Sequence, residues 1–252
     1  MSDKFISRAK LHDWLEELSS AFEIWTPVNT GQDAKGAVVY RPLAGGRPPE
    51  FARKPVESAK HVVFPRSETL MNFKTGAKEG NPALELHVPA DPPARAIFGL
   101  PSCDARGFQI FDPVYNGSGT QGLARDNYYL RRRSATLLIV KACSKILNTC
   151  FCNWVGGGPA CTDGADVLAT ELQDGFTLAP VTARGEAALG SALLDPASGS
   201  QEKQARKQHE EAAAALCASP DLSGSADALR GKFDDLAFWE AEASKCLSCG
   251  AC

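Results

Sequence analysis

The sequence has no long hydrophobic run, and this excludes one class of protein at the outset. Its longest strongly apolar stretch is Leu137–Val140, whereas a membrane-spanning helix needs about 20 residues. The first residues, MSDKFISRAKLHDWL, are polar and lack the apolar core of a secretory signal. The sequence therefore predicts a soluble, cytoplasmic protein without a membrane span.

The sequence also has no excess of charge of one sign. It holds 27 lysines and arginines against 30 aspartates and glutamates, for a net charge of −3. A nucleic-acid-binding protein shows a basic surface footprint, so we predict no nucleic-acid partner. With 252 residues, 44% of them hydrophobic, the chain is long enough for one large domain or two small ones with a buried core.

Histidine is scarce while cysteine is abundant. The four histidines, His12, His61, His87 and His209, include no pair spaced four residues apart, whereas there are nine cysteines. Disulfides are not expected in a chain without an export signal, so metal ligation is the leading explanation for so many cysteines. Any metal site should therefore use sulfur ligands.

The last eight residues, K-C-L-S-C-G-A-C, carry the most specific motif. Cys246, Cys249 and Cys252 follow one another at three-residue intervals, the spacing with which bacterial ferredoxins begin a [4Fe–4S] site. The residues between them are mostly small, which lets backbone N–H groups approach the cluster sulfides. The alternatives are a zinc site, which needs a second ligand pair that is not evident here, and redox or inert thiols.

A second group of cysteines lies in the middle of the chain. Cys103 and Cys143 follow two short apolar runs that we predict to be buried strands, at 96–100 and 136–140. Ligands bind beyond the carboxyl ends of such strands, and a helix beginning near Cys103 would favour a thiolate or an anionic cluster. With Cys150 and Cys152 they would supply four ligands to a further cluster. Structural thiols, or Cys103 as a nucleophile, are the alternatives. Cys161 is a fifth candidate outside this set of four, and Cys217 is interpreted as a packing residue.

The periodicity of the chain predicts an α/β fold, with a mixed sheet and flanking helices. Apolar residues at helical intervals predict an amphipathic helix from Leu11. The remaining predicted elements are strands at 22–28, 37–40, 61–64, 83–88, 166–170 and 175–180, and a helix at 198–217 that begins with a capping box. A stripe from Leu229 to Ala243 predicts one packed helix leading to the terminal motif. We place a domain boundary near 220, giving a 1–220 α/β domain and a 221–252 helical, ferredoxin-like cluster-binding part.

Two further features would suit a flavin- or nucleotide-binding catalytic subunit. The segment 117–122 satisfies the pattern G-x-G-x-x-G, and Arg131–Arg133 form a basic cluster. The glycine segment, however, does not follow a predicted strand, and arginine clusters commonly form a solvated face or salt bridges. We therefore interpret the first as a loop and the second as a surface feature.

Several motifs together resemble one protein group. They are V-F-P-R-S-E-T at 63–69, F-G-L-P-S-C-D-A at 98–105, D-N-Y-Y-L-R-R at 126–132, C-F-C at 150–152 and G-G-G-P at 156–159. The chain is similar to the beta subunit of soluble sulfhydrogenases and to the corresponding iron–sulfur subunit of anaerobic sulfite reductase. The resemblance covers most of residues 60–180 and the terminal motif.

The resemblance implies a non-catalytic iron–sulfur electron-transfer subunit of an oxidoreductase complex. Such subunits relay electrons between a partner that binds FAD and NAD(P) and a catalytic hydrogenase or reductase subunit. It implies [4Fe–4S] ligation by Cys246, Cys249 and Cys252, and by a central set of Cys103, Cys143, Cys150 and Cys152. Family members continue beyond the first motif, so we expect this sequence to be part of a longer protein. Otherwise the fourth terminal ligand would be Cys217 or come from a partner.

Overall fold

The structure is a computed structural model that describes residues 2–31, 36–43, 47–78, 81–118 and 125–246. By its internal contacts the chain divides into two compact units, Met1–Cys217 and Ala218–Cys252. Unit 1 contains the four central cysteines of the predicted site, and unit 2 contains the terminal motif.

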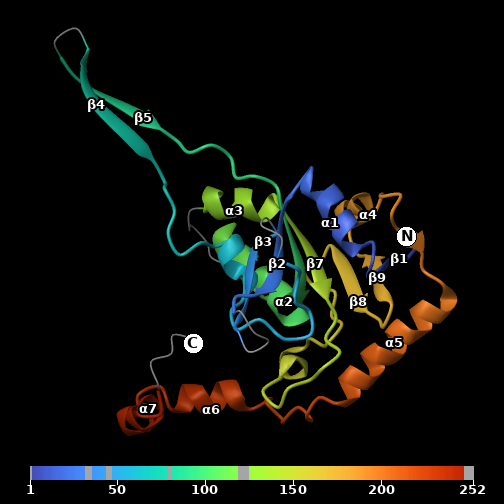
Figure 1. Ribbon diagram of the computed structural model, residues 1–252. Helices are drawn as coiled ribbons and strands as arrows, with labels where there is room; N and C mark the ends of the chain where they lie inside the picture. The colour runs from blue at the N-terminus through green and yellow to red at the C-terminus, as the bar shows by residue number, and fades with distance from the viewer. Residues whose placement is uncertain (1, 32–35, 44–46, 79–80, 119–124, 247–252) are drawn as a thin grey trace. The chain divides into compact units, whose positions relative to one another are not determined.

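Unit 1 is built on an eight-stranded mixed sheet in the order β10-β1-β9-β8-β7-β6-β2-β3 (Figure 1). Its strands are β1 Lys4–Ser7, β2 Glu23–Asn29, β3 Val38–Pro42, β6 Arg95–Pro101, β7 Thr136–Lys141, β8 Val167–Glu171, β9 Gly175–Pro180 and β10 Asp195–Pro196. The four central strands β2, β6, β7 and β8 run parallel, and the outer strands are antiparallel. The sheet therefore has one edge at which the carboxyl ends of its central strands meet.

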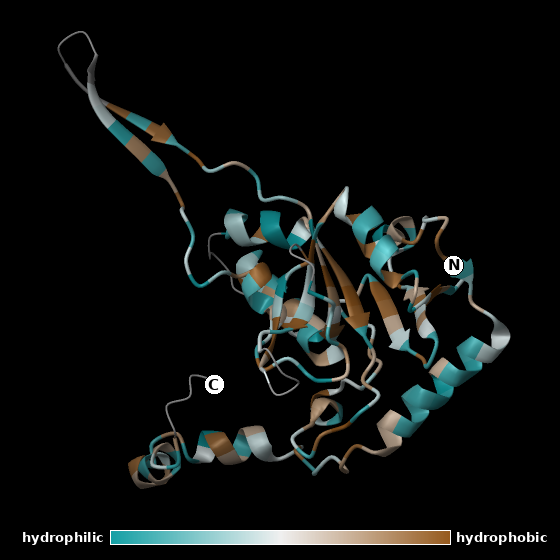
Figure 2. Cartoon of the chain, in the orientation of Figure 1, coloured by the Kyte–Doolittle hydropathy of each residue, from teal (hydrophilic) through white to brown (hydrophobic). Residues whose placement is uncertain are grey.

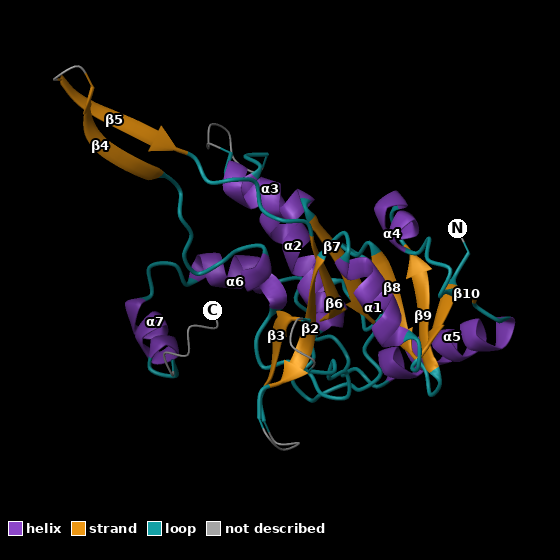
Figure 3. Cartoon of the chain, turned by 45° about the horizontal axis from the view of Figure 1, so that its top comes forward, coloured by secondary structure: helices purple, strands orange, loops and turns teal. Residues whose placement is uncertain are grey.

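The two central strands are buried on both faces, which explains why they are apolar throughout. Side chains of β6 and β7 alternate between two hydrophobic clusters, one on each face of the sheet, as the two-residue period of a strand requires. Helices cover both faces (Figure 3): α1 and α4 on one, α2 and α3 on the other. Their bounds are α1 Leu11–Ser19, α2 Ser102–Tyr115, α3 Asn127–Ser134 and α4 Ala183–Ala188. The predicted mixed α/β class is thus confirmed.

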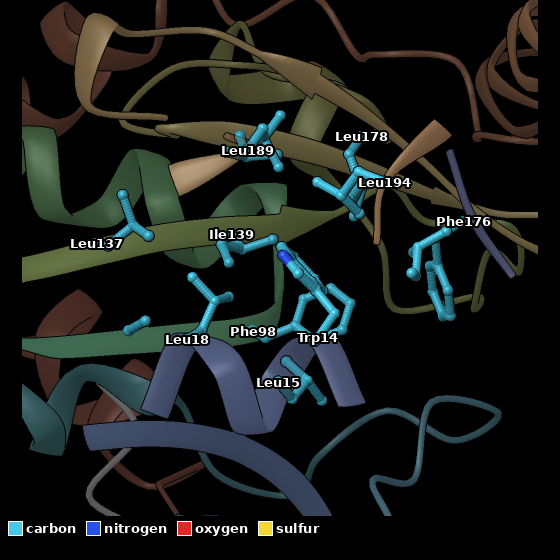
Figure 4. Packing of buried hydrophobic residues seen from close by; sticks show 14 of the residues in the cluster. Trp14, Leu15, Leu18, Phe98, Leu137, Ile139, Phe176, Leu178, Leu189 and Leu194 are labelled. Atoms are coloured by element: carbon cyan, nitrogen blue, oxygen red, sulfur yellow. The ribbon is translucent and has the colours of Figure 1, made fainter. Parts of the chain in front are cut away.

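Aromatic rings fill the core between α1 and the sheet (Figure 4). The Trp14 and Phe98 ring centroids lie 6.1 Å apart in an edge-to-face arrangement, and Phe98 lies 5.6 Å from Phe176. Trp14, Leu15 and Leu18 are the buried residues of α1, so the helix predicted from their spacing is confirmed, and it packs by that stripe.

The helix predicted after Ser198 is also confirmed, as α5 Gly199–Ala214. The Ser198 side chain accepts a hydrogen bond from the Gln201 N–H, and the Gln201 side chain accepts one from Ser198 N–H, which is a complete capping box. Much of α5 is hydrophilic (Figure 2). His209 reaches the sheet, where its Nε2 lies 2.8 Å from the Thr170 hydroxyl.

The strand predicted at 61–64 is wrong. The segment instead forms a short 3-10 helix, η1 Ala59–Val62, whose Ser58 N-cap accepts a hydrogen bond from the Lys60 N–H. The strand predicted at 83–88 is confirmed as β5 Asn81–His87, but its partner β4 Asn72–Lys78 was not predicted. These two strands form a separate antiparallel hairpin that shares no strand pairing with the large sheet.

The described residues of unit 2 form two short helices, α6 Ser225–Gly231 and α7 Leu236–Ala243. The single packed helix predicted over 229–243 is wrong because the chain leaves the helix after Gly231, and Asp235 starts a new one by accepting a hydrogen bond from the Phe238 N–H at 3.0 Å. The apolar residues of the predicted stripe are consequently exposed, Phe233 by 78% and Leu236 by 74%. Among the helices of the described residues, none combines the length and the apolar character that crossing a membrane requires.

Candidate metal centre

The sheet places two of the central cysteines side by side at its carboxyl edge. β6 and β7 are parallel and in register up to the pair Pro101 and Lys141, and Cys103 and Cys143 each follow two residues later. Cys103 is the second residue of α2. Residues forty positions apart in the sequence thus meet where an open α/β sheet binds its ligands.

The carbonyl of Pro159 holds a third segment against these two strand ends. It accepts a hydrogen bond from the buried Ser102 hydroxyl at 3.0 Å and one from the Cys143 N–H at 2.9 Å. The loop that carries Cys150 and Cys152 is therefore tied to the ends of both β6 and β7.

Within this loop, a short 3-10 helix, η2 Cys152–Val155, ends at Gly156, which has a φ of +75°. The Gly157 N–H donates to the Cys152 carbonyl at 2.8 Å, and a Cβ on Gly157 would lie 3.2 Å from that same oxygen. The Arg106 side chain packs against both glycines and donates to the Val155 carbonyl. Glycine here lets the backbone fold tightly beside Cys152.

Electrostatic interactions link the four central thiols, because Cys143 and Cys152 act on Cys103, and Cys150 and Cys152 act on Cys143. Burial, the Asp104 carboxylate and the neighbouring Cys143 raise the pKa of Cys103 to about 11. Burial raises the pKa of Cys143 as well, and the neighbouring Cys150 and Cys152 add to this shift. Lys54 and Lys141 oppose it. These influences outweigh the helix N-terminus that we expected to favour a thiolate, so the raised pKa argues against Cys103 as a nucleophile.

A lysine that no sequence pattern singles out completes the site. The Lys54 Nζ lies 3.2 Å from the Cys150 sulfur, and the Leu147 N–H lies 3.4 Å from the same atom. Burial alone would lower the pKa of Lys54, but its electrostatic interactions with Cys143 and Cys150 and its hydrogen bond to Cys150 raise it. Lys54 comes from the Pro- and Arg-rich segment that precedes η1, and only the fold brings its charge to the cysteines.

Two cavities adjoin the thiols. One, of about 320 Å³, includes Lys54, Lys141 and Cys143 in its lining. The other, of about 70 Å³, includes Cys103, Cys152 and Cys161. Cys161, which is not among the predicted ligands, therefore lies beside two of them.

The chemistry of the donor set is suited to an iron–sulfur cluster, because the converging donors are thiols. In the described part of the chain, no three Cys, His, Asp or Glu side chains are grouped so that they could hold one metal ion. A zinc ion needs its ligands on a single tetrahedron. A cubane instead takes one thiolate at each of its four iron corners, so its ligands lie farther apart.

The terminal motif lies only partly within the described residues. Cys246 is exposed and follows α7, after Lys245, whose Nζ lies 2.6 Å from Glu242 Oε1. Cys249 and Cys252 lie outside the described residues. Cys217, considered as a fourth terminal ligand, is exposed and belongs to unit 1, where its carbonyl accepts a hydrogen bond from the Asn153 amide at 2.8 Å.

The arginine cluster is occupied by ion pairs within unit 1. Arg131 pairs with Asp91 at 3.0 Å, and Arg133 with Asp112 at 3.3 Å. Arg132, itself buried, contacts the Glu68 carboxylate with both of its terminal nitrogens. These pairs support the salt-bridge alternative, whereas the burial of Arg132 shows that the cluster is not wholly the surface feature we predicted. Most of the glycine segment lies outside the described residues.

Comparison with known proteins gives one informative relative. No family model matches the chain, and no solved structure matches it. Sulfhydrogenase 2 subunit beta of Pyrococcus furiosus is 32% identical to it over 162 residues. The chain is therefore similar to this sulfhydrogenase beta subunit. This confirms the resemblance seen in the motifs. The match covers 62% of this chain and 45% of the relative, so the chain spans less than half of that sulfhydrogenase subunit.

Proposed function

We propose that this chain is an electron-transfer subunit of a multi-subunit oxidoreductase. The observation that carries the proposal is the convergence of Cys103, Cys143, Cys150 and Cys152 from separate segments at the carboxyl edge of the sheet. We propose that these four residues hold a [4Fe–4S] cluster. Such a cluster accepts and donates one electron at a time within a potential range set by its surroundings.

The residues around the thiols are suited to an anionic group. The Lys54 ammonium and the Leu147 N–H both approach the Cys150 sulfur, and charge-assisted contacts of this kind stabilise anionic sulfur. The fully buried Tyr40 closes the site from the side of β3, donating its hydroxyl hydrogen to the Gly99 carbonyl at 3.2 Å. Burial and the charges of Asp104, Cys103 and Cys143 raise the Tyr40 pKa, so its hydroxyl stays neutral.

We further propose that residues 221–252 form the start of a ferredoxin-like module after a 1–220 α/β domain. The three-residue spacing of Cys246, Cys249 and Cys252 supports their assignment as its opening cluster ligands. The relative's description as a subunit supports a complex of several chains. By the family resemblance, the partners are a subunit that binds FAD and NAD(P) and a catalytic hydrogenase or reductase subunit.

The test is iron and acid-labile sulfide per chain in protein purified without oxygen, with EPR of the reduced state. Cys143→Ser should lose about four irons and the signal of one cluster. Cys217→Ser, a matched control outside the central thiol group, should keep the signal of the central cluster. Zinc without sulfide in the wild-type protein would support a zinc-stabilised structural subunit instead. Bound flavin recovered from the isolated chain would support a catalytic subunit.

A further inference from the structure

The hairpin formed by β4 and β5 has one apolar and one polar face. In the antiparallel register Phe73 lies opposite Leu86, and Thr75 opposite Leu84. Directly opposed residues share a face, and so do residues two apart on one strand. Met71 and Val88 continue the same alternation. The resulting apolar hairpin face consists of Met71, Phe73, Leu84, Leu86 and Val88.

The opposite face is polar and balanced in charge. Lys74 lies opposite Glu85, and Asn72 opposite His87. Opposite charges facing each other across two strands stabilise the pairing modestly. This face is therefore suited to solvent exposure, and the alternation of polar and apolar side chains along each strand specifies which face of the hairpin is apolar.

The described residues leave the apolar hairpin face uncovered. Each of its five side chains is at least half exposed, with Phe73 the most exposed at 67%. The apolar residues of β6, from Ala96 to Leu100, are instead completely buried. A two-stranded hairpin is marginally stable in water unless its hydrophobic face packs against something, and contiguous exposed apolar patches of this kind mark interaction sites.

We infer that the apolar hairpin face docks into an apolar groove of a different subunit of the complex. The face offers roughly 500 Å² of side-chain surface, judged from its exposed fractions and typical side-chain areas. Two copies meeting face to face would bury only about 1,000 Å² in total, whereas obligate homodimers bury roughly 2,000 Å² or more. A groove that encloses the ribbon, which is about 23 Å long, also covers its edges and approaches the standard interface of about 1,600 Å². The inference rests on the proposed function only in requiring a multi-subunit complex.

The test uses the complex isolated from its native host through a tag on this chain. A photoreactive p-benzoylphenylalanine replaces Phe73 in one variant and Lys74, on the polar face, in a control. We expect position 73 to form an adduct with a different polypeptide that co-purifies in a fixed ratio to this chain, and position 74 to form far less. Adducts joining two copies of this chain, or equal labelling from both positions, would overturn the inference.

A second pair of variants tests the energy of the contact. Phe73→Asp with Leu84→Asp should weaken retention of that subunit by roughly 30-fold or more, as the loss of a buried interface anchor does. The control, Lys74→Glu with Glu85→Lys, keeps the cross-strand charge pair and should retain the docked subunit. Full retention of that subunit by both double variants would contradict docking. Iron per chain should be the same in all variants, so a failure of the cluster proposal appears as missing iron while a failure of docking appears as an unchanged subunit ratio.

Discussion

The two cysteine groups of this chain are built in opposite ways. The terminal motif is local, because Cys246, Cys249 and Cys252 are specified by spacing within seven residues. The central group joins residues up to 49 positions apart, from Cys103 to Cys152, and depends on two parallel strands that end in register. Spacing reveals a site of the first kind. A site of the second kind is predicted only through the strands whose ends carry its residues.

The largest expected difference is between the units that carry the two cysteine groups, in how much stability each loses when an aromatic side chain is removed. Phe98→Ala removes a fully buried ring that contacts Trp14, Phe51 and Phe176. It should lower the free energy of unfolding of unit 1 by about 3–5 kcal/mol. Phe233→Ala in unit 2, at a side chain that is 78% exposed, should change stability by about 0.5 kcal/mol or less.

Urea unfolding of both variants, followed by near-UV circular dichroism, gives these values. Equal losses of stability would show that Phe233 is packed, and the contrast between a buried unit 1 and an exposed stripe in unit 2 would then fail.

A smaller effect should distinguish the two proposed clusters, because each has a different neighbouring lysine. Lys54→Met removes the ammonium 3.2 Å from the Cys150 sulfur, so the reduced, more negative state of the proposed central cluster would lose stabilisation. Its midpoint potential should become more negative, as followed by EPR during a redox titration. Lys54→Arg, which keeps the charge, should largely restore it.

The matched control for this experiment is Lys245→Met. Lys245 adjoins Cys246, and its ammonium pairs with Glu242 at 2.6 Å. The Lys245→Met substitution should therefore leave the EPR signal and midpoint potential of the proposed central cluster unchanged. A central potential that does not respond to Lys54→Met would exclude a role for this lysine in setting it.

The smallest expected effect is on the pH dependence of the stability of unit 1. Burial lowers the pKa of His209 below its ordinary value of 6.5, so folded unit 1 favours the neutral ring. A lowered folded-state pKa contributes stability that is present above pH 6.5 and is lost as the pH falls through the folded value. His209→Gln should therefore lose less stability than the wild type between pH 7.5 and 5.5.

Paired unfolding curves at the two pH values measure this difference. In unit 2 the carboxyls with shifted pKa are Asp221 and Asp235, both lowered from 3.8 by local hydrogen bonds, so their contribution is lost only in stronger acid. An identical pH dependence in wild type and variant would exclude His209 as the cause.

The sequence was informative where one physical effect dominates. Continuous apolar runs identified β6 and β7, because strands buried on both faces must be apolar throughout. The positions of Cys103 and Cys143 at the carboxyl edge of the sheet followed from those strands. The capping box at Ser198 located α5 for a similarly local reason.

Other features depend on contacts that no local pattern encodes. Lys54 reaches Cys150 across 96 positions of sequence, and nothing in its neighbours distinguishes it from a surface lysine. β4 was missed because N-F-K-T-G-A-K is half polar, as expected for a hairpin strand with one wet face. The stripe from Leu229 to Ala243 has helical spacing, but Asp235 serves better as the cap of a new helix than as an interior residue.

The double acceptor role of Pro159 has a consequence for the biogenesis of this protein. Its carbonyl fixes the cysteine loop through Ser102 and Cys143, using bonds to which no metal contributes. Zinc fingers, in contrast, acquire their fold only when the ion binds. Here the two hydrogen bonds come from the polypeptide itself, so under the proposed function iron would be delivered to thiols that the backbone already holds at the strand ends.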